Sequence, residues 1–164
     1  MNRISRPRES YSGRLLMAQI PARNTSKYAG HYAGTLGSQR MLEIFADSYK
    51  IALSSKNPDT AGDRFALAVE AYHQFMSMEP RAESRAALQQ AMEELVDLFP
   101  TQVAANEARG LREKARKLKT PWKQLELLRR ASEIVNRGLT EHPSNSVLQT
   151  AAAELQTEIS GVRG

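Results

Sequence analysis

The chain has no cysteine among its 164 residues. This absence excludes disulfide bonds, thiol nucleophiles and cysteine-based zinc sites, although it does not fix the compartment. No apolar run approaches the roughly 20 residues that span a bilayer. The apolar residues 15–20 are too few and too interrupted for the core of a secretory signal peptide. We therefore expect a cytoplasmic protein that is neither secreted nor membrane-spanning.

Motifs that carry chemistry are also scarce. No glycine-rich segment has the preceding strand and the following Lys-Ser or Lys-Thr of a phosphate-binding loop. The Glu93/Asp97 pair could bind a cation, but an exposed acidic helix face is the more common meaning of such a pair. The three histidines share neither a helix face nor a ligand spacing: His31, His73 and His142. We expect no catalytic, metal-binding or cofactor-binding residue and no enzymatic activity.

The net charge of +5 is unevenly distributed. Residues 1–38 hold six basic side chains against Glu9 alone, whereas the remaining 126 residues hold 17 basic and 17 acidic side chains. The positive charge therefore belongs to an N-terminal arm, residues 1–37. A helical domain, residues 38–164, follows it and is neutral overall.

The arm interleaves arginine with tyrosine and contains scattered glycine and proline. This composition cannot bury enough apolar surface to fold alone. It suits docking on a protein partner first, contact with nucleic acid second, and an uninvolved tail third. The arginine-rich, acid-poor start of the arm is also typical of a mitochondrial presequence, an interpretation that we rank below the other three. The candidate contact residues are Arg3, Arg6, Arg8, Tyr11, Arg14, Arg23, Lys27, Tyr28 and Tyr32.

Five prolines recur at intervals of 20–22 residues through the helical domain. Proline fits the first turn of a helix and breaks a helix interior, so each predicts a helix boundary. Apolar residues recur at three- and four-residue steps between them, as one face of a helix requires. The prolines are Pro58, Pro80, Pro100, Pro121 and Pro143.

This pattern predicts an all-α fold of about six antiparallel helices. Short turns between long helices favour three stacked hairpins, as an α-solenoid or a bundle. The predicted helices cover residues 38–55, 58–78, 80–99, 101–119, 121 to the turn at 142–145, and from that turn to about 160.

Residues 131–153 resemble the second half of a tetratricopeptide repeat. That repeat favours a small residue, a large residue, a small residue followed by Leu, then proline and Asn, which here are Ala131, Val135, Gly138-Leu139, Pro143 and Asn145. The unit in this chain is about 42 residues rather than about 34, and the aromatic-and-glycine signature of the first repeat helix is not found. The resemblance implies a stacked-hairpin scaffold that holds partner proteins, and it implies no catalytic residue.

Basic residues also cluster between Arg109 and Arg130. Residues 41–106 hold ten acidic and five basic side chains, so the helical domain is acidic at one end and basic at the other. Head-to-tail self-association, docking on nucleic acid and a merely solvated helix face all fit this pattern. The candidate contacts are Arg109, Arg112, Arg116, Lys119 and Lys123.

We therefore expect a non-enzymatic scaffold or assembly subunit that binds another protein or itself, with the basic arm as an anchor. The alternative is a nucleic-acid-binding or nucleoprotein-assembly component that uses the arm and the Arg109–Lys123 face. The two differ in salt dependence, because phosphate contacts weaken steeply as salt rises.

Overall fold

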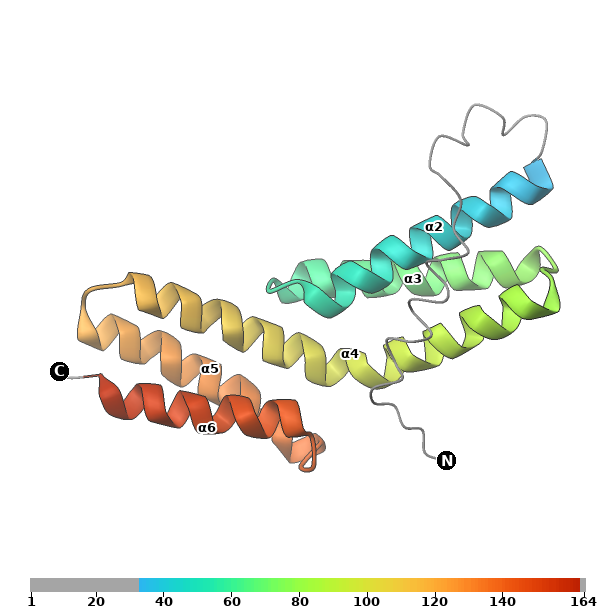
Figure 1. Ribbon diagram of the computed structural model, residues 1–164. Helices are drawn as coiled ribbons and strands as arrows, with labels where there is room; N and C mark the ends of the chain where they lie inside the picture. The colour runs from blue at the N-terminus through green and yellow to red at the C-terminus, as the bar shows by residue number, and fades with distance from the viewer. Residues whose placement is uncertain (1–32, 163–164) are drawn as a thin grey trace. The chain divides into compact units, whose positions relative to one another are not determined.

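The computed structural model describes residues 33–162, and within that range the chain forms helices joined by short turns and has no strand. It has five helices there, which confirms the all-α class (Figure 1). The residues predicted as contacts in the arm, residues 1–32, lie outside the described residues. The helices are α2 (Ala33–Ser54), α3 (Pro58–Ser77), α4 (Ala82–Lys117), α5 (Pro121–Glu141) and α6 (Ser146–Gly161).

Three of the helix starts lie where the sequence predicts them. Pro58 and Pro121 open α3 and α5. The Asn57 side chain accepts hydrogen bonds from the backbone N–H groups of Asp59 and Thr60, at 2.9 and 3.3 Å. Asn145 caps α6 by accepting from the N–H of Leu148 at 2.9 Å. These caps satisfy backbone donors that have no partner inside a helix.

The prediction that Pro100 separates two helices is wrong. Residues 80–99 and 101–119 form one helix, α4, with Pro100 in its interior. Proline there removes one backbone hydrogen bond and disfavours the helix by about 3 kcal/mol. Next to the proline, the Thr101 hydroxyl donates to the Leu98 carbonyl at 3.2 Å. Apolar residues on both sides of Pro100 are buried, and their burial favours a continuous helix.

The described chain divides into two compact units. Unit 1 consists of residues 33–52 and 62–97, and unit 2 of residues 53–61 and 98–162. Helix α4 contributes to both. The sequence predicted one helical domain over residues 38–164 and did not predict its division into two units. Helix α2 also begins at Ala33, five residues before the predicted start at Ser38.

Unit 1 has an aromatic core. Phe45 of α2 and Phe75 of α3 are fully buried with Leu88 and Leu95 of α4. The ring of Tyr49 lies 6.0 Å from that of Phe45, and the Tyr49 hydroxyl donates to Glu94 of α4 at 3.5 Å. The buried face of α2 therefore follows the predicted apolar stripe.

Unit 1 also buries polar groups. Glu43 of α2 is 5% exposed, and Ser48 is fully buried. Arg40 approaches one carboxylate oxygen of Glu43 at 3.4 Å. The other oxygen, Oε2, and the Ser48 hydroxyl have no hydrogen-bond partner among the described residues. A buried polar atom without a partner destabilises the fold.

The turn between α3 and α4 has one strained residue. Glu79 has φ of 52°, the left-handed region that glycine adopts without penalty. Its N–H donates to the Met76 carbonyl at 3.3 Å, which closes the end of α3. Pro80 follows directly, and α4 begins two residues later at Ala82 rather than at the proline.

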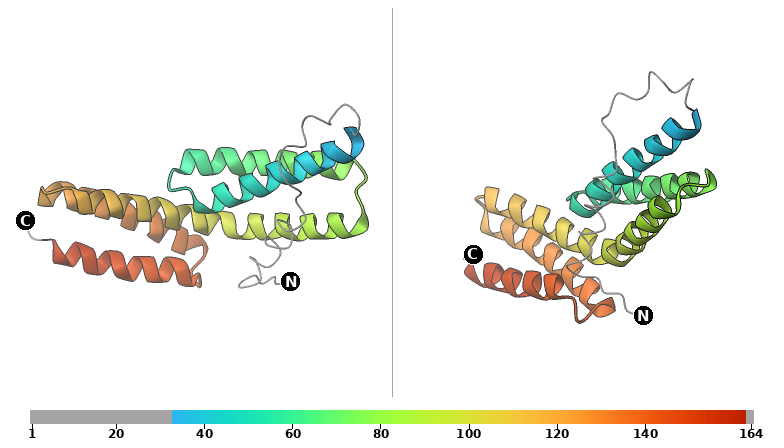
Figure 2. Two further views of the ribbon diagram at one scale, coloured as in Figure 1. Left: turned by 45° about the horizontal axis from the view of Figure 1, so that its top comes forward. Right: turned by 45° about the vertical axis from the view of Figure 1, so that its right-hand side comes forward.

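Unit 2 has a smaller-residue core between α4, α5 and α6, and α5 packs along α6 in both views of Figure 2. Gly138 of α5 allows the closest approach, because a Cβ atom there would lie 2.9 Å from Leu148 of α6. The buried core residues are Ala108, Leu111, Ala115, Leu128, Ala131, Val135, Leu148 and Leu155.

The segment 53–61 belongs to unit 2 through its contacts with α4. The Leu53 carbonyl accepts from the Asn106 side chain at 2.8 Å, and Asn106 is buried. Lys56 forms an ion pair with Glu113, whose pKa is lowered chiefly by that hydrogen bond. Gly110 leaves room for the Lys56 stem, since a Cβ atom at Gly110 would lie 3.1 Å from it.

Candidate functional site

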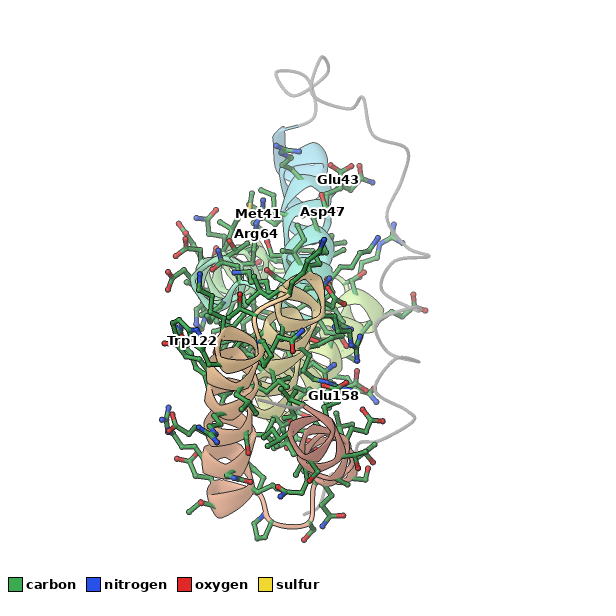
Figure 3. All side chains as sticks on the ribbon, turned by 90° about the vertical axis from the view of Figure 1, so that its left-hand side faces the viewer. Met41, Glu43, Asp47, Arg64, Trp122 and Glu158 are labelled. Carbon is green, nitrogen blue, oxygen red and sulfur yellow. The ribbon has the colours of Figure 1, made fainter. Side chains whose placement is uncertain are left out.

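The N-terminal end of α5 places a large aromatic side chain at the surface. Thr120 precedes the helix with an extended backbone, and Pro121 sets the first turn. Trp122 follows, and its side chain is 63% exposed (Figure 3). It is the only tryptophan in the chain. Single exposed apolar residues are common, but an exposed tryptophan is enriched at binding surfaces.

The surface around Trp122 is a shallow hollow on one face of α5. The buried face of that helix holds Leu128, Ala131 and Val135. The hollow lies on the face away from them, because its residues recur at a helical spacing on another side of the helix. We call it the α5 stripe, and its lining residues are Trp122, Leu125, Glu126, Arg129, Arg130 and Glu133.

The α5 stripe carries charges of both signs. Glu126, Arg129, Arg130 and Glu133 are all exposed. Among the described residues none of these four takes part in an ion pair. Lys123 lies beside the stripe with its Nζ 5.7 Å from the centre of the Trp122 ring, a cation–π contact.

Four of the predicted basic contacts lie on α4 or just after it. Arg109, Arg116 and Lys119 are exposed, but Arg112 is only 15% exposed. The structure therefore separates Arg112 from the exposed set, and Lys119 lies in the loop before α5. Lys123, the fifth predicted contact, lies beside the α5 stripe.

Arg112 is bound by two glutamates of α6. Its Nε and Nη2 donate to the two oxygens of Glu158 at 3.1 and 3.0 Å, and its Nη1 donates to Glu154 at 2.9 Å. Arg116 donates to the same Glu158 at 2.6 Å. This geometry is the two-pronged pairing that arginine makes with carboxylates.

The network fixes the charge states of its members. Hydrogen bonding from Arg112 lowers the pKa of Glu158, with Arg116 adding to the effect against the opposing influence of burial. The hydrogen bond to Glu158 likewise raises the pKa of Arg112. Arg112 therefore joins α4 to α6 through its pairing with Glu154 and Glu158.

The described helices were also compared with the requirements of a metal site and of a membrane span. Among residues 33–162, no group of three or more histidine, aspartate and glutamate side chains is arranged to hold a metal ion. None of the helices in that range has the length and hydropathy that crossing a bilayer requires. Of the predicted contacts, Arg3, Arg6, Arg8, Tyr11, Arg14, Arg23, Lys27, Tyr28 and Tyr32 lie outside the described residues.

Sequence reasoning missed Trp122 and the rest of the α5 stripe. A signal was present, because Trp122 lies off the face defined by Leu128, Ala131 and Val135 and directly follows a helix-opening proline. The pairing of Arg112 with Glu158 had no local signal, since the two residues are 46 positions apart.

No protein-family model, no curated protein and no solved structure matches this chain. The resemblance of residues 131–153 to a tetratricopeptide repeat therefore stays a prediction.

Proposed function

We propose that the chain is a non-enzymatic scaffold or assembly subunit that acts by binding protein. The observation that carries the proposal is the exposed Trp122 at the end of a mixed-charge stripe on α5. Aromatic and arginine side chains contribute most of the binding energy at protein interfaces. Arg129 and Arg130 have no partner among the described residues, so both are available to one.

The resemblance of residues 131–153 to the second half of a tetratricopeptide repeat supports the same role. The small residue expected at Gly138 is the point where Leu148 makes its closest approach, as a tightly packed helix pair requires. Stacked hairpins of this type hold protein partners on a concave or lateral face. The basic arm, residues 1–37, would then anchor the chain in its assembly.

Nucleic-acid binding is the second candidate. Trp122 with Lys123, Arg129 and Arg130 offers a stacking ring beside cationic groups, which single-stranded nucleic acid favours. Glu126 and Glu133 lie among these groups, however, and would repel phosphates. Arg112 and Arg116 are already paired with Glu158. These charges favour protein as the ligand.

Photo-crosslinking from the stripe tests the proposal. A benzophenone amino acid is placed at position 122 of the full chain in its native host, with the same group at the exposed Ser144 as the matched control. We expect protein adducts from position 122 that are absent from position 144 and survive nuclease. Adducts that disappear on nuclease treatment would instead support nucleic-acid binding. Equal adducts from both positions would refute a binding role for this face.

A further inference from the structure

The α5 stripe has an internal symmetry. Its six residues form three pairs that are equally distant from the point between Leu127 and Leu128: Trp122 with Glu133, Leu125 with Arg130, and Glu126 with Arg129. If two copies of α5 lie antiparallel about a two-fold axis at that point, each residue lies level with its mate in the other copy. A two-fold contact requires such a self-complementary surface.

The charges on the stripe match this arrangement. Glu126 of each copy faces Arg129 of the other, which gives two equivalent ion pairs across the axis. Trp122 faces Glu133 of the other copy, where its ring covers the methylene groups and its N–H can donate to the carboxylate. No pairing of like charge arises among the three mates.

The four charged residues of the α5 stripe form no ion pairs with one another in the described chain. Glu126 and Arg130, like Arg129 and Glu133, are four residues apart, the spacing that commonly forms ion pairs on a helix. Neither pair, nor Glu126 with Arg129, is within ion-pair distance in the described chain. All four charges are therefore available to groups on another molecule.

We propose that the stripe is a homodimer contact in which two copies of α5 pack antiparallel, Glu126 against Arg129. The inference rests on the proposed function, because it names the protein partner as a second copy of this chain. The stripe spans 11 residue steps, about 17 Å of helix. An interface of this length is smaller than a standard protein–protein interface, so the dimer is weak and forms in a concentration-dependent manner.

Charge exchange tests the pairing in the full chain by sedimentation equilibrium, from micromolar to about 1 mM protein. We expect the wild type to dimerise over that range. Glu126→Arg and Arg129→Glu should each weaken dimerisation by at least about tenfold, because each variant opposes like charges twice. The double variant carrying both changes should dimerise as the wild type does. Both positions are exposed, and the helical circular dichroism of each variant confirms that it folds.

Mixing the two single variants is the decisive measurement. One copy then presents two glutamates and the other two arginines, so a mixed dimer should form although neither variant dimerises alone. Failure of the mixture to associate overturns the proposal. A wild type that stays monomeric throughout the range overturns it too. In either case protein adducts from position 122 that contain a different chain would leave the proposed function standing.

Discussion

The two units differ in how they accommodate buried charge. Unit 1 buries the Glu43 carboxylate, one oxygen of which lies 3.4 Å from Arg40 while the other has no hydrogen-bond partner among the described residues. Unit 2 places Arg112 between two carboxylates that accept a hydrogen bond from each of its three guanidinium nitrogens. Burying a charge costs free energy in both cases, but only the Arg112 network offsets that cost with several charge-assisted hydrogen bonds. A buried charge therefore stabilises one unit and weakens the other.

Replacing one glutamate by methionine in each unit is the most direct test of this difference. Glu158→Met removes the carboxylate that binds Arg112 and Arg116, and we expect it to lower the free energy of unfolding by about 2 kcal/mol. Glu43→Met keeps a similar shape and removes a buried carboxylate whose only ion pair among the described residues is the 3.4 Å contact with the exposed Arg40, so we expect it to raise that free energy by up to about 1 kcal/mol. Urea unfolding of the full chain measures both.

Equal losses in the two methionine variants would contradict the comparison. Glu133→Met serves as the control, because Glu133 is exposed and has no ion pair among the described residues. Its expected effect on stability is within about 0.5 kcal/mol of zero.

Glycine substitutions compare the packing of the two units. Gly138→Ala in unit 2 brings a Cβ atom within 2.9 Å of Leu148, and we expect a loss of about 1–2 kcal/mol. Gly62→Ala in unit 1 meets no atom within 4 Å, and it should raise the stability by up to about 1 kcal/mol because alanine favours the helix. Thermal unfolding, monitored by circular dichroism, shows whether each variant is more or less stable than the wild type. A stabilising Gly138→Ala would contradict this prediction, because it would show that the contact between α5 and α6 accommodates a Cβ atom at position 138.

Acid should weaken unit 2 through Glu158. Its pKa is lower in the folded chain than in the unfolded chain, because Arg112 donates to the ionised form. The stabilisation is therefore present above the unfolded-state pKa and is lost as the pH falls through the lower folded-state pKa. Amide hydrogen exchange in α6, measured at a series of acid pH values, should show this loss.

The variant Arg112→Met provides the control for the acid effect. It removes the main cause of the lowered pKa, so exchange in α6 should start faster and depend less on pH in the same window. An unchanged pH dependence in this variant would assign the acid effect to other carboxylates.

The smallest expected effect is at the turn of unit 1. Glu79→Gly relieves the left-handed backbone but adds freedom to the unfolded chain, and we expect a net gain of about 0.5 kcal/mol. Ser77→Gly, inside the last turn of α3, should lower the stability by a similar amount. Urea unfolding curves of both variants measure these changes. A loss of stability in Glu79→Gly would contradict the backbone strain assigned to Glu79.

Local sequence rules predicted the parts of this fold that local chemistry decides. Asn57, Pro58, Pro121 and Asn145 act within a few residues of the helix ends they define. Pro100 did not, because the burial of residues on both sides of it favours one continuous helix over the local preference of proline.

The candidate site shows the same limit. The basic residues of α4 were correctly placed on a helix, but the pairing of Arg112 depends on Glu154 and Glu158, which follow 42 and 46 residues later. Composition alone cannot distinguish a paired arginine from an available one. The α5 stripe was in principle readable from sequence, because a helix period alone separates Trp122 from the buried Leu128 and Val135.

The path of the chain through the two units affects the order in which they can fold during synthesis. Residues 53–61 emerge from the ribosome before residues 62–97, which complete unit 1. The partners of Leu53 and Lys56 are Asn106 and Glu113, 53 and 57 residues further along. Leu53 and Lys56 therefore cannot form these two contacts until residues 62–113 have been synthesised. For the same reason, no single cut in the chain separates one intact unit from the other.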